Sequence, residues 1–271
     1  MEYRSAYDYG VNNRFRHKDH IMTDNRIVLV TGANQGIGFQ TAKQLAEKGL
    51  TVLVASRDLA NGEAAVKDIG KGAHAIQIDV TDQKSIDAAA ARIEKEYGHL
   101  DILINNAAIS KIGQPKGPVE EIAKSGHISV VKLDDIRTLY DTNVFGVIAV
   151  TQAMLPLLRK AKGARIVNVS SGVGSLTRTL GEGGEHLRQI YGMYSASKTA
   201  LNAITVGLAL DLQKEGITVH AVCPGYTKTA LNNFMGTKPV EEGAYEPVRV
   251  ALANPPLPTA SYTGTGETFA W

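Results

Sequence analysis

Two side chains in the second half of the sequence have the types and spacing needed for proton transfer. Tyr194 and Lys198 lie four residues apart, and residues at i and i+4 project from the same face of a helix. A free tyrosine has a pKa of about 10, so acid–base work near neutral pH needs a shift of about 4 kcal/mol. An ammonium about 4 Å away supplies about that much at an effective dielectric constant of about 20. We therefore expect Lys198 to lower the pKa of Tyr194.

The alternative is that the pair has no catalytic role, because a Tyr-x-x-x-Lys spacing is more often found on the solvent-exposed surface of a helix. Tyr191 does not compete with Tyr194, since its fourth neighbour is Ser195 rather than a cation. A β-branched run before the pair predicts a strand, and this strand ends in Ser170-Ser171. The position of the pair beyond this strand, in a chain that also has a glycine-rich turn of the dinucleotide-binding kind, favours catalysis.

A glycine-rich turn near the start of the chain predicts a diphosphate site. Residues 26–31 form a short apolar run, typical of a strand buried on both faces, and Gly32, Gly36 and Gly38 follow it. A helical pattern then runs from about residue 37 to residue 48. A diphosphate must approach the backbone N–H groups of a helix N-terminus, where any Cβ would obstruct it. For the glycines alone, an ordinary turn between a strand and a helix is the alternative.

The residue after the second predicted strand indicates which dinucleotide binds. Residues 51–56 form this strand, and Arg57 follows it, nineteen residues beyond Gly38. A carboxylate at this place binds the 2′-hydroxyl of NAD, whereas a guanidinium accommodates the 2′-phosphate of NADP. The alternative is a solvated charge at a strand end. With the glycine turn before it, Arg57 favours NADP(H).

Strands and helices alternate along the rest of the chain, which predicts an α/β fold with a doubly wound parallel sheet of the Rossmann type. We expect one domain over residues 26–271, preceded by a mobile N-terminal extension over residues 1–25. The other predicted strands are 73–78, 100–104, 165–169, 217–222 and a last short one near 266–269. The other predicted helices are 58–69, 81–97, 133–160, 194–214 and 240–252.

Composition narrows the function classes. The formal net charge of +2 gives no indication of binding to nucleic acid or to an anionic membrane. The single cysteine, Cys223, excludes an internal disulfide and a cysteine-rich metal site. It suits a reducing compartment, so we expect a cytoplasmic protein without a metal. No uninterrupted apolar run reaches the roughly 18 residues of a membrane span.

Several short motifs, taken in order, resemble those of the short-chain dehydrogenase/reductase family. They are Thr31–Gly38, Asp79-Val80, Asn105–Ala108, Asn143, Ser170-Ser171, Tyr194-x-x-x-Lys198 and Pro224-Gly225. Ala108 departs from the family, which usually has glycine there. The resemblance implies reversible reduction of a ketone or aldehyde with NADPH, with Tyr194 giving a proton to the oxygen. The long 109–133 connection and the interval between Ser171 and Tyr194 resemble the carbonyl-reductase-like branch.

The resemblance also implies roles for single residues. Ser171, rather than Ser170, would donate to the substrate carbonyl, and Lys198 would hold the nicotinamide ribose. Asn143 would hold a water at a local break in its helix. The implied catalytic residues are Asn143, Ser171, Tyr194 and Lys198. The implied cofactor residues are Gly32, Asn34, Gln35, Gly36, Ile37, Gly38, Arg57, Asp79, Val80, Asn106, Ala107, Ala108, Tyr194, Lys198, Pro224, Gly225, Thr227 and Thr229.

Two other functions stay open. One is an NADP-binding regulator without turnover, although such proteins typically lose the tyrosine or the lysine. The other is a sugar-nucleotide epimerase or dehydratase, which would want a larger C-terminal substrate domain. Substrate choice is expected to rest on residues 109–133, 172–190 and 226–240.

The expected partner is a small carbonyl or alcohol substrate. The two long helices, 133–160 and 194–214, are apolar nearly all round, so the face away from the sheet also needs a cover. Residues 172–190 could fold over it. We favour instead a homodimer or homotetramer through these helices, because that segment is glycine-rich and short of apolar side chains.

Overall fold

The structure is a computed structural model and describes residues 26–110 and 124–271. Predictions for residues 1–25 and 111–123 lie outside the described residues. The strands are β1 Ile27–Val30, β2 Thr51–Ser56, β3 Ala73–Gln77, β4 Ile102–Asn105, β5 Arg165–Val169, β6 Thr218–Cys223, β7 Ser261–Gly264 and β8 Glu267–Thr268. The α-helices are α1 Gly36–Glu47, α2 Leu59–Ile69, α3 Gln83–Tyr97, α5 Leu133–Tyr140, α6 Gly146–Leu158, α7 Leu176–Leu180, α8 Glu185–Gln189, α9 Met193–Leu212, α10 Val240–Gly243 and α11 Tyr245–Leu252. The other helical segments are the π-helix η1 Asp141–Phe145 and the 3₁₀-helices η2 Gly172–Gly174, η3 Gln213–Glu215 and η4 Ala230–Asn232.

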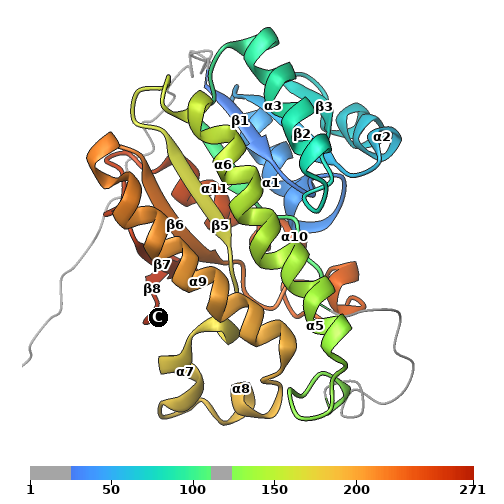
Figure 1. Cartoon of the computed structure of the whole chain (residues 1–271), viewed down its shortest axis with the longest axis vertical. Helices are drawn as coiled ribbons and strands as arrows, with labels where there is room; N and C mark the ends of the chain where they lie inside the picture. Colours follow the sequence, from blue (N-terminus) through green and yellow to red (C-terminus); the bar gives the residue numbers. More distant parts are fainter. Residues whose placement is uncertain (1–25, 111–123) are drawn as a thin grey trace, which may run out of the picture.

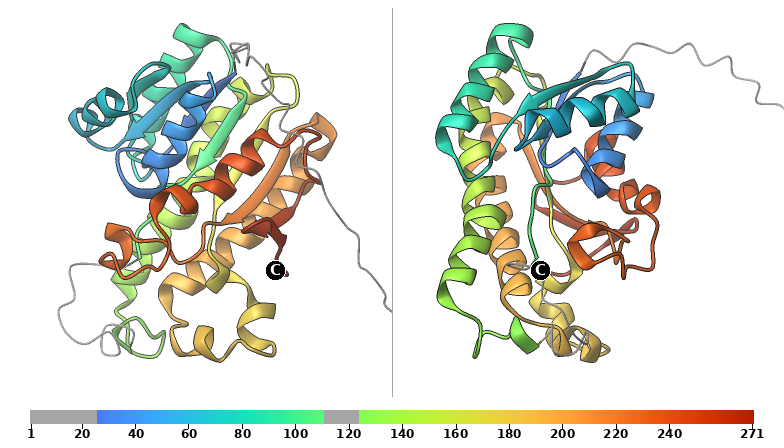
Figure 2. Two further views of the ribbon diagram at one scale, coloured as in Figure 1. Left: turned by 180° about the vertical axis from the view of Figure 1, so that it is seen from behind. Right: turned by 90° about the vertical axis from the view of Figure 1, so that its right-hand side faces the viewer.

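The strands form one eight-stranded sheet in the order β3-β2-β1-β4-β5-β6-β7-β8, parallel except for the antiparallel β7–β8 pair. The predicted doubly wound α/β fold is thus confirmed. Alternate residues of each inner strand enter opposite cores. Leu29 packs with α3, α6 and α9 on one face, and Val28 packs with α1, α2 and α11 on the other. The two helical layers stand on either side of the sheet in Figure 2.

The end of the chain and one long helix differ from the prediction. The predicted strand near 266–269 is β8, but β7 before it was missed, because Ser261–Gly264 is a short run with two polar residues. The predicted helix over 133–160 ends at Leu158, and η1 separates its two α-helical parts around Asn143, where a local break was expected. Residues 172–190 are not merely a polar loop, since they form η2, α7 and α8.

Among the described helices, the continuous stretch Leu133–Leu158 is long and apolar enough to cross a membrane by length and composition alone. Half of its most apolar window is buried inside the protein. Its residues Val150 and Met154 pack in the core beneath the sheet. These contacts are those of a core helix.

The helices α6 and α9 lie side by side on one face of the sheet, and α7 and α8 lie beyond the end of α9 (Figure 1). Phe145 before α6 and Leu210 on α9 stay 56% and 65% exposed. Self-association through these two helices stays a prediction.

Two side chains join the carboxyl ends of β1 and β4. The hydroxyl of Thr31 accepts hydrogen bonds from the backbone N–H groups of Asn106, at 2.9 Å, and Ala107, at 3.1 Å. In return, the Asn106 amide donates to the carbonyls of Thr31, at 2.8 Å, and Gly32, at 3.1 Å. Gly38 lies directly against this amide. A Cβ at Gly38 would stand 2.3 Å from Asn106 Nδ2 and 2.5 Å from the Gly32 carbonyl oxygen.

We expect Gly38→Ala to lower the free energy of unfolding by about 1–3 kcal/mol, because backbone and a bonded amide must shift to admit the methyl group. Gly207→Ala is the matched control, since a Cβ at this exposed position of α9 meets nothing within 4 Å. The control should be neutral or more stable by up to about 1 kcal/mol. Urea denaturation measures both, and equal midpoints for the two variants would contradict the prediction.

Candidate active site

The predicted catalytic residues meet at the carboxyl end of β5. Tyr194 and Lys198 come from the first two turns of α9, and Ser171 follows β5. Lys198 is 3% exposed, and its ammonium donates to the Val169 carbonyl at 2.8 Å and lies 5.8 Å from the centre of the Tyr194 ring. Ser171 forms a side-chain hydrogen bond with the Tyr194 hydroxyl. The hydroxyl expected to transfer the proton therefore has a second hydroxyl beside it.

The expected electrostatic effect of Lys198 is wrong in this structure. Burial raises the pKa of Tyr194, a negative charge on Cys223 would raise it further, and the hydrogen bond with Ser171 offsets only part of the rise. Burial also lowers the pKa of Lys198 to about 8. The simple Coulomb estimate counted the attraction and omitted the desolvation of both groups, which dominates here. Tyr194 therefore holds its proton, as a proton donor must.

The structure separates each predicted residue from its nearest competitor. Ser170 donates to Asn202 Oδ1 at 2.6 Å and is buried, so its hydroxyl is already committed to α9. Tyr191 shares a hydrogen bond of 3.1 Å with the Thr199 hydroxyl. Ser171 and Tyr194 are the pair that the fold brings together.

Asn143 lies in η1, where the helix is locally wider, and is fully buried. Its side-chain oxygen accepts from the N–H of Ile109 at 2.9 Å, and its amide donates to the Ile109 carbonyl at 2.8 Å. The amide also donates to Ser197 Oγ at 3.1 Å. This side chain joins the segment after β4 to α9, and its role toward a water stays a prediction.

The glycine turn has the features that a diphosphate needs. Gly32 and Gly36 have φ angles of +61° and +59°, which disfavour other residues. The N-terminus of α1 has no side-chain cap, whereas α2 and α3 are capped by Asp58 and Asp82. The first N–H groups of α1 are thus left for an external acceptor, so these residues fit a dinucleotide.

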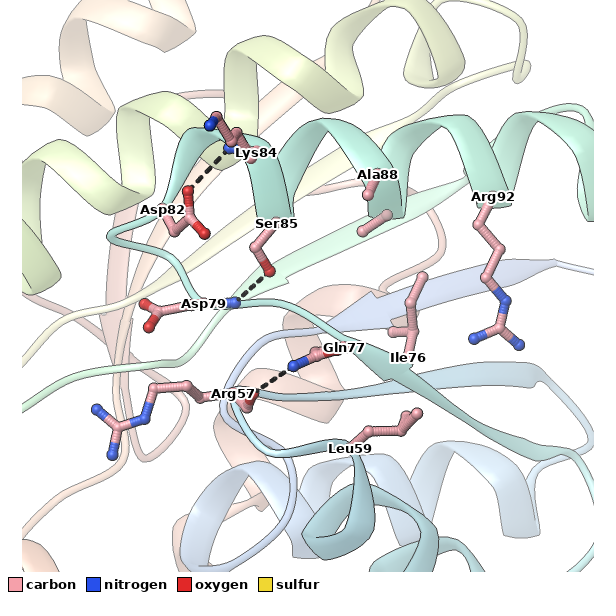
Figure 3. Close-up of a pocket in the computed structure, with 11 residues that line it drawn as sticks. Arg57, Leu59, Ile76, Gln77, Asp79, Asp82, Lys84, Ser85, Ala88 and Arg92 are labelled. Carbon is pink, nitrogen blue, oxygen red and sulfur yellow. Dashed lines mark hydrogen bonds between the residues drawn. The ribbon is translucent and has the colours of Figure 1, made fainter.

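Arg57 and Asp79 line a cavity of about 580 Å³ between the edge strand β3 and α3 (Figure 3). Their charged ends point to the same side of it, away from Arg92 at the other end of the cavity. One oxygen of Asp79 accepts from the N–H of Thr81 at 2.9 Å and from its hydroxyl at 2.7 Å. This cavity contains none of the four predicted catalytic residues. The predicted catalytic residues and Arg57 thus lie on different parts of the carboxyl edge.

The remaining predicted cofactor residues lie on the glycine turn or follow β3, β4 and β6. Asn34, Gln35 and Ile37 are on the glycine turn and the start of α1, Val80 follows Asp79, and Ala107-Ala108 follow Asn106. Thr227 is buried and its hydroxyl donates to the carbonyls of Pro224 and Gly225. Thr229 touches the glycine turn, since its methyl group is 3.5 Å from the position of a Cβ on Gly36.

Within residues 26–110 and 124–271, no group of three histidine, cysteine, aspartate or glutamate side chains is arranged to hold a metal ion.

The sequence profile of the family described as short chain dehydrogenase matches residues 26–239. The chain belongs to the short-chain dehydrogenase family. It is therefore an oxidoreductase that reduces carbonyl groups with a nicotinamide cofactor.

Curated relatives and solved structures of short-chain dehydrogenases agree with this assignment. The chain is 39% identical to the short-chain dehydrogenase anuI of Penicillium roqueforti, over 85% of this chain and 90% of the relative. The structure of salutaridine reductase from Papaver somniferum matches with a TM-score of 0.72 and 31% identity, over 88% of this chain and 99% of that one. A 3-ketoacyl-(acyl-carrier-protein) reductase from Brucella melitensis, complexed with NADH, matches with a TM-score of 0.73 and 25% identity, over 89% and 96%.

Sequence reasoning missed a residue that holds the loop of Ser171. The Tyr262 hydroxyl of β7 donates to the Ser171 carbonyl at 2.5 Å, and Ser175 Oγ donates to the Ala270 carbonyl at 2.6 Å. The Tyr262 ring stacks on Trp271, with centroids 5.2 Å apart. No local pattern connects Tyr262 with Ser171, which lies 91 residues earlier. Only the pairing of β6 with β7 brings the two together.

The buried ammonium of Lys198 gives the short-chain dehydrogenase a pH-dependent stability in the absence of cofactor. Its pKa falls from 10.5 to about 8 on folding, which corresponds to about 3 kcal/mol of cost at neutral pH. The unfolded chain binds more protons between these values, so this cost disappears as the pH rises. Relative to Lys198→Met, the parent should gain about 2 kcal/mol between about pH 7 and about pH 9.5.

Urea denaturation of both proteins at the two pH values measures this difference. Lys214→Met, at an exposed lysine of η3, controls for the removal of a charge. Parallel pH dependence in the parent and Lys198→Met would show that the ammonium is not desolvated.

Proposed function

We propose that this protein reduces a ketone or aldehyde to an alcohol with NADPH, reversibly. The observation that carries the proposal is the pairing of Tyr194 with Ser171 beside the buried Lys198. Burial keeps the proton on the Tyr194 hydroxyl, which is the protonation state that carbonyl reduction requires. Relatives with reductase names, such as salutaridine reductase of Papaver bracteatum at 31% identity, support this direction.

Each residue has one task in the reaction. Ser171 donates a hydrogen bond to the carbonyl oxygen and draws electron density from the carbon. The bound nicotinamide supplies the hydride. Tyr194 transfers its proton to the oxygen as the C–O double bond becomes single, so a neutral alcohol leaves. Lys198 places a positive charge below the tyrosinate that results, and this charge stabilises the anion as it forms.

The preference for NADPH over NADH rests on Arg57. Its exposed guanidinium lies at the end of β2, where the adenosine ribose is expected. A guanidinium binds a phosphate through charged, two-pronged hydrogen bonds. Asp79 lies on the same side of the cavity, but its carboxylate is engaged with Thr81.

A non-catalytic NADP-binding regulator is the second candidate. Such a regulator would have a cofactor site but no working proton donor. The pairing of Tyr194 with Ser171 favours turnover instead. An NADPH-oxidation screen over aliphatic, aromatic and quinone carbonyls separates the two, because a regulator consumes no NADPH with any of them.

We expect Tyr194→Phe to lower kcat by at least about 100-fold, because the variant lacks the proton that general acid catalysis transfers. Its affinity for NADPH, measured by fluorescence titration, should change less than about threefold, since no more than one hydrogen bond is removed. Tyr191→Phe is the matched control and should keep kcat within about twofold of the parent. A dead Tyr191 variant and an active Tyr194 variant would reverse the assignment.

We expect Arg57→Asp to change the coenzyme preference from NADPH toward NADH. The substitution replaces a partner of the 2′-phosphate with a charge that repels it and that accepts from a 2′-hydroxyl. Titration of parent and variant with both coenzymes tests the change. Equal affinities of the parent for NADPH and NADH would refute the role of Arg57.

A further inference from the structure

Two cations lie close to Cys223 at the carboxyl end of β6, next to the loop that presents Ser171. Arg178 belongs to α7, and its guanidinium lies 3.9 Å above the centre of the Phe269 ring. One of its nitrogens, Nη1, is 3.0 Å from the position that a Cβ on Gly172 would occupy. Gly172 directly follows Ser171, so the guanidinium lies over the backbone that presents the predicted carbonyl-binding hydroxyl.

Lys238 lies near Cys223 at the turn that follows β6. Its side chain crosses Gly225, with Nζ 3.1 Å from the position of a Cβ on that residue. Cys223 lies between the two cations, because its sulfur accepts from the N–H of Gly172 at 3.0 Å and from the N–H of Gly225 at 3.4 Å. Both Arg178 and Lys238 are close enough to Cys223 to act against the rise that burial causes in its pKa.

Neither cation is neutralised within residues 26–110 and 124–271. The guanidinium of Arg178 and the ammonium of Lys238 form no ion pair and donate no hydrogen bond there. By contrast, other arginines of the described chain pair with carboxylates, as Arg159 does with Glu215 and Arg249 with Glu246. No carboxylate is among the groups that perturb the pKa of Tyr194, Lys198 or Cys223. Within the described residues, the surroundings of Cys223, beside the loop of Ser171, therefore carry positive charge that no carboxylate offsets.

We propose that Arg178 and Lys238 bind a carboxylate on the substrate, so that the protein reduces an oxo acid whose carboxylate lies near the reacting carbonyl. This inference rests on the proposed function. The planar guanidinium, supported by the Phe269 ring, suits a carboxylate because it offers two parallel donors at a fixed orientation. Ring stacking also fixes a side chain that would otherwise lose rotamer freedom on binding.

Exposed aromatic side chains of the loop that carries Lys238 indicate the rest of the substrate. The backbone N–H of Lys238 donates to the Tyr226 carbonyl at 3.0 Å, so the two residues are neighbours. Tyr226 and Phe234 are 53% and 68% exposed in this loop. An aromatic 2-oxo acid combines a carboxylate with an apolar ring, and phenylglyoxylate is the simplest probe of this class.

The test compares phenylglyoxylate with its methyl ester, which carries the same ketone without the charge. NADPH oxidation should give the parent a kcat/KM at least about 10-fold higher for the acid. Arg178→Gln and Lys238→Gln should each lose this preference while their kcat/KM for the ester stays within about threefold of the parent. Arg178→Lys should recover part of it. Arg159→Gln, which removes an ion-paired arginine at the end of α6, should keep the full preference.

A second measurement shows whether the two cations bind a carboxylate of the substrate or a phosphate of the cofactor. If the two cations served a phosphate of the cofactor instead, both variants would weaken NADPH binding in a fluorescence titration and would lower turnover of acid and ester equally. That result overturns the proposal, as does a parent that reduces the ester as well as the acid. Turnover of the ester without any preference refutes this inference alone, whereas no NADPH consumption with any carbonyl refutes the proposed function and this inference with it.

Discussion

The reciprocal hydrogen bonds between Thr31 and Asn106 are the constraint on which the cofactor edge depends. Parallel strands meet at their carboxyl ends, but backbone pairing alone does not fix the turns that leave them. Here a hydroxyl accepts two backbone N–H groups of one turn, and an amide donates to two carbonyls of the other. These bonds hold the glycine turn in its left-handed geometry, and Gly38 must lack a side chain so that the amide can reach across. The position of α1, and of every N–H group at its start, follows from this contact.

A second polar network joins the two halves of the sheet to the helices that carry the chemistry. Asn105 on β4 donates to Asn168 on β5 at 2.9 Å and to Thr151 on α6 at 3.2 Å. Asn168 donates in turn to Thr205 on α9 at 2.9 Å. All four side chains are buried, so leaving any one without a partner would cost free energy. The network therefore fixes the register of α9 against β5, and that register sets Tyr194 beside Ser171.

The electrostatics of the site show why spacing alone is a poor guide to a pKa. The four-residue interval correctly places Tyr194 and Lys198 on one helix face. It does not reveal that Lys198 is covered by the sheet and bonded to the Val169 carbonyl. Burial penalises the ammonium and the tyrosinate alike, so each group shifts toward its neutral form. A charged cofactor and a developing negative charge on the substrate oxygen change this balance only when they are present.

The sequence was sufficient to predict those elements whose pattern lies in neighbouring residues. Apolar strands, capped helices and the glycine turn all depend on neighbouring residues. The observed sheet has the parallel core that was predicted from them. The local break at Asn143, which is a π-helix in the structure, was expected from family resemblance rather than from composition. β7 escaped prediction because Tyr262 is the one large apolar side chain of its four residues, and the strand gains its stability from pairing with β6. The contact between Tyr262 and Ser171 could not be predicted either, since it exists only after that pairing.

The residues proposed for proton transfer and those proposed for substrate recognition stand on different elements, but one segment is in contact with both. Proton transfer tolerates little displacement, so Tyr194 and Ser171 stand on α9 and at the end of β5, inside a network of buried hydrogen bonds. The cations that face a substrate stand on the short helix α7 and on the loop after β6. Arg178 is nevertheless held by Phe269, and Phe269 is bonded through its N–H to the carbonyl of Tyr262, whose own hydroxyl holds Ser171. The segment after β7 therefore supports both Ser171, proposed to bind the carbonyl, and Arg178, proposed to bind the carboxylate. A change in this segment would shift both at once, which ties the choice of substrate to the geometry of catalysis.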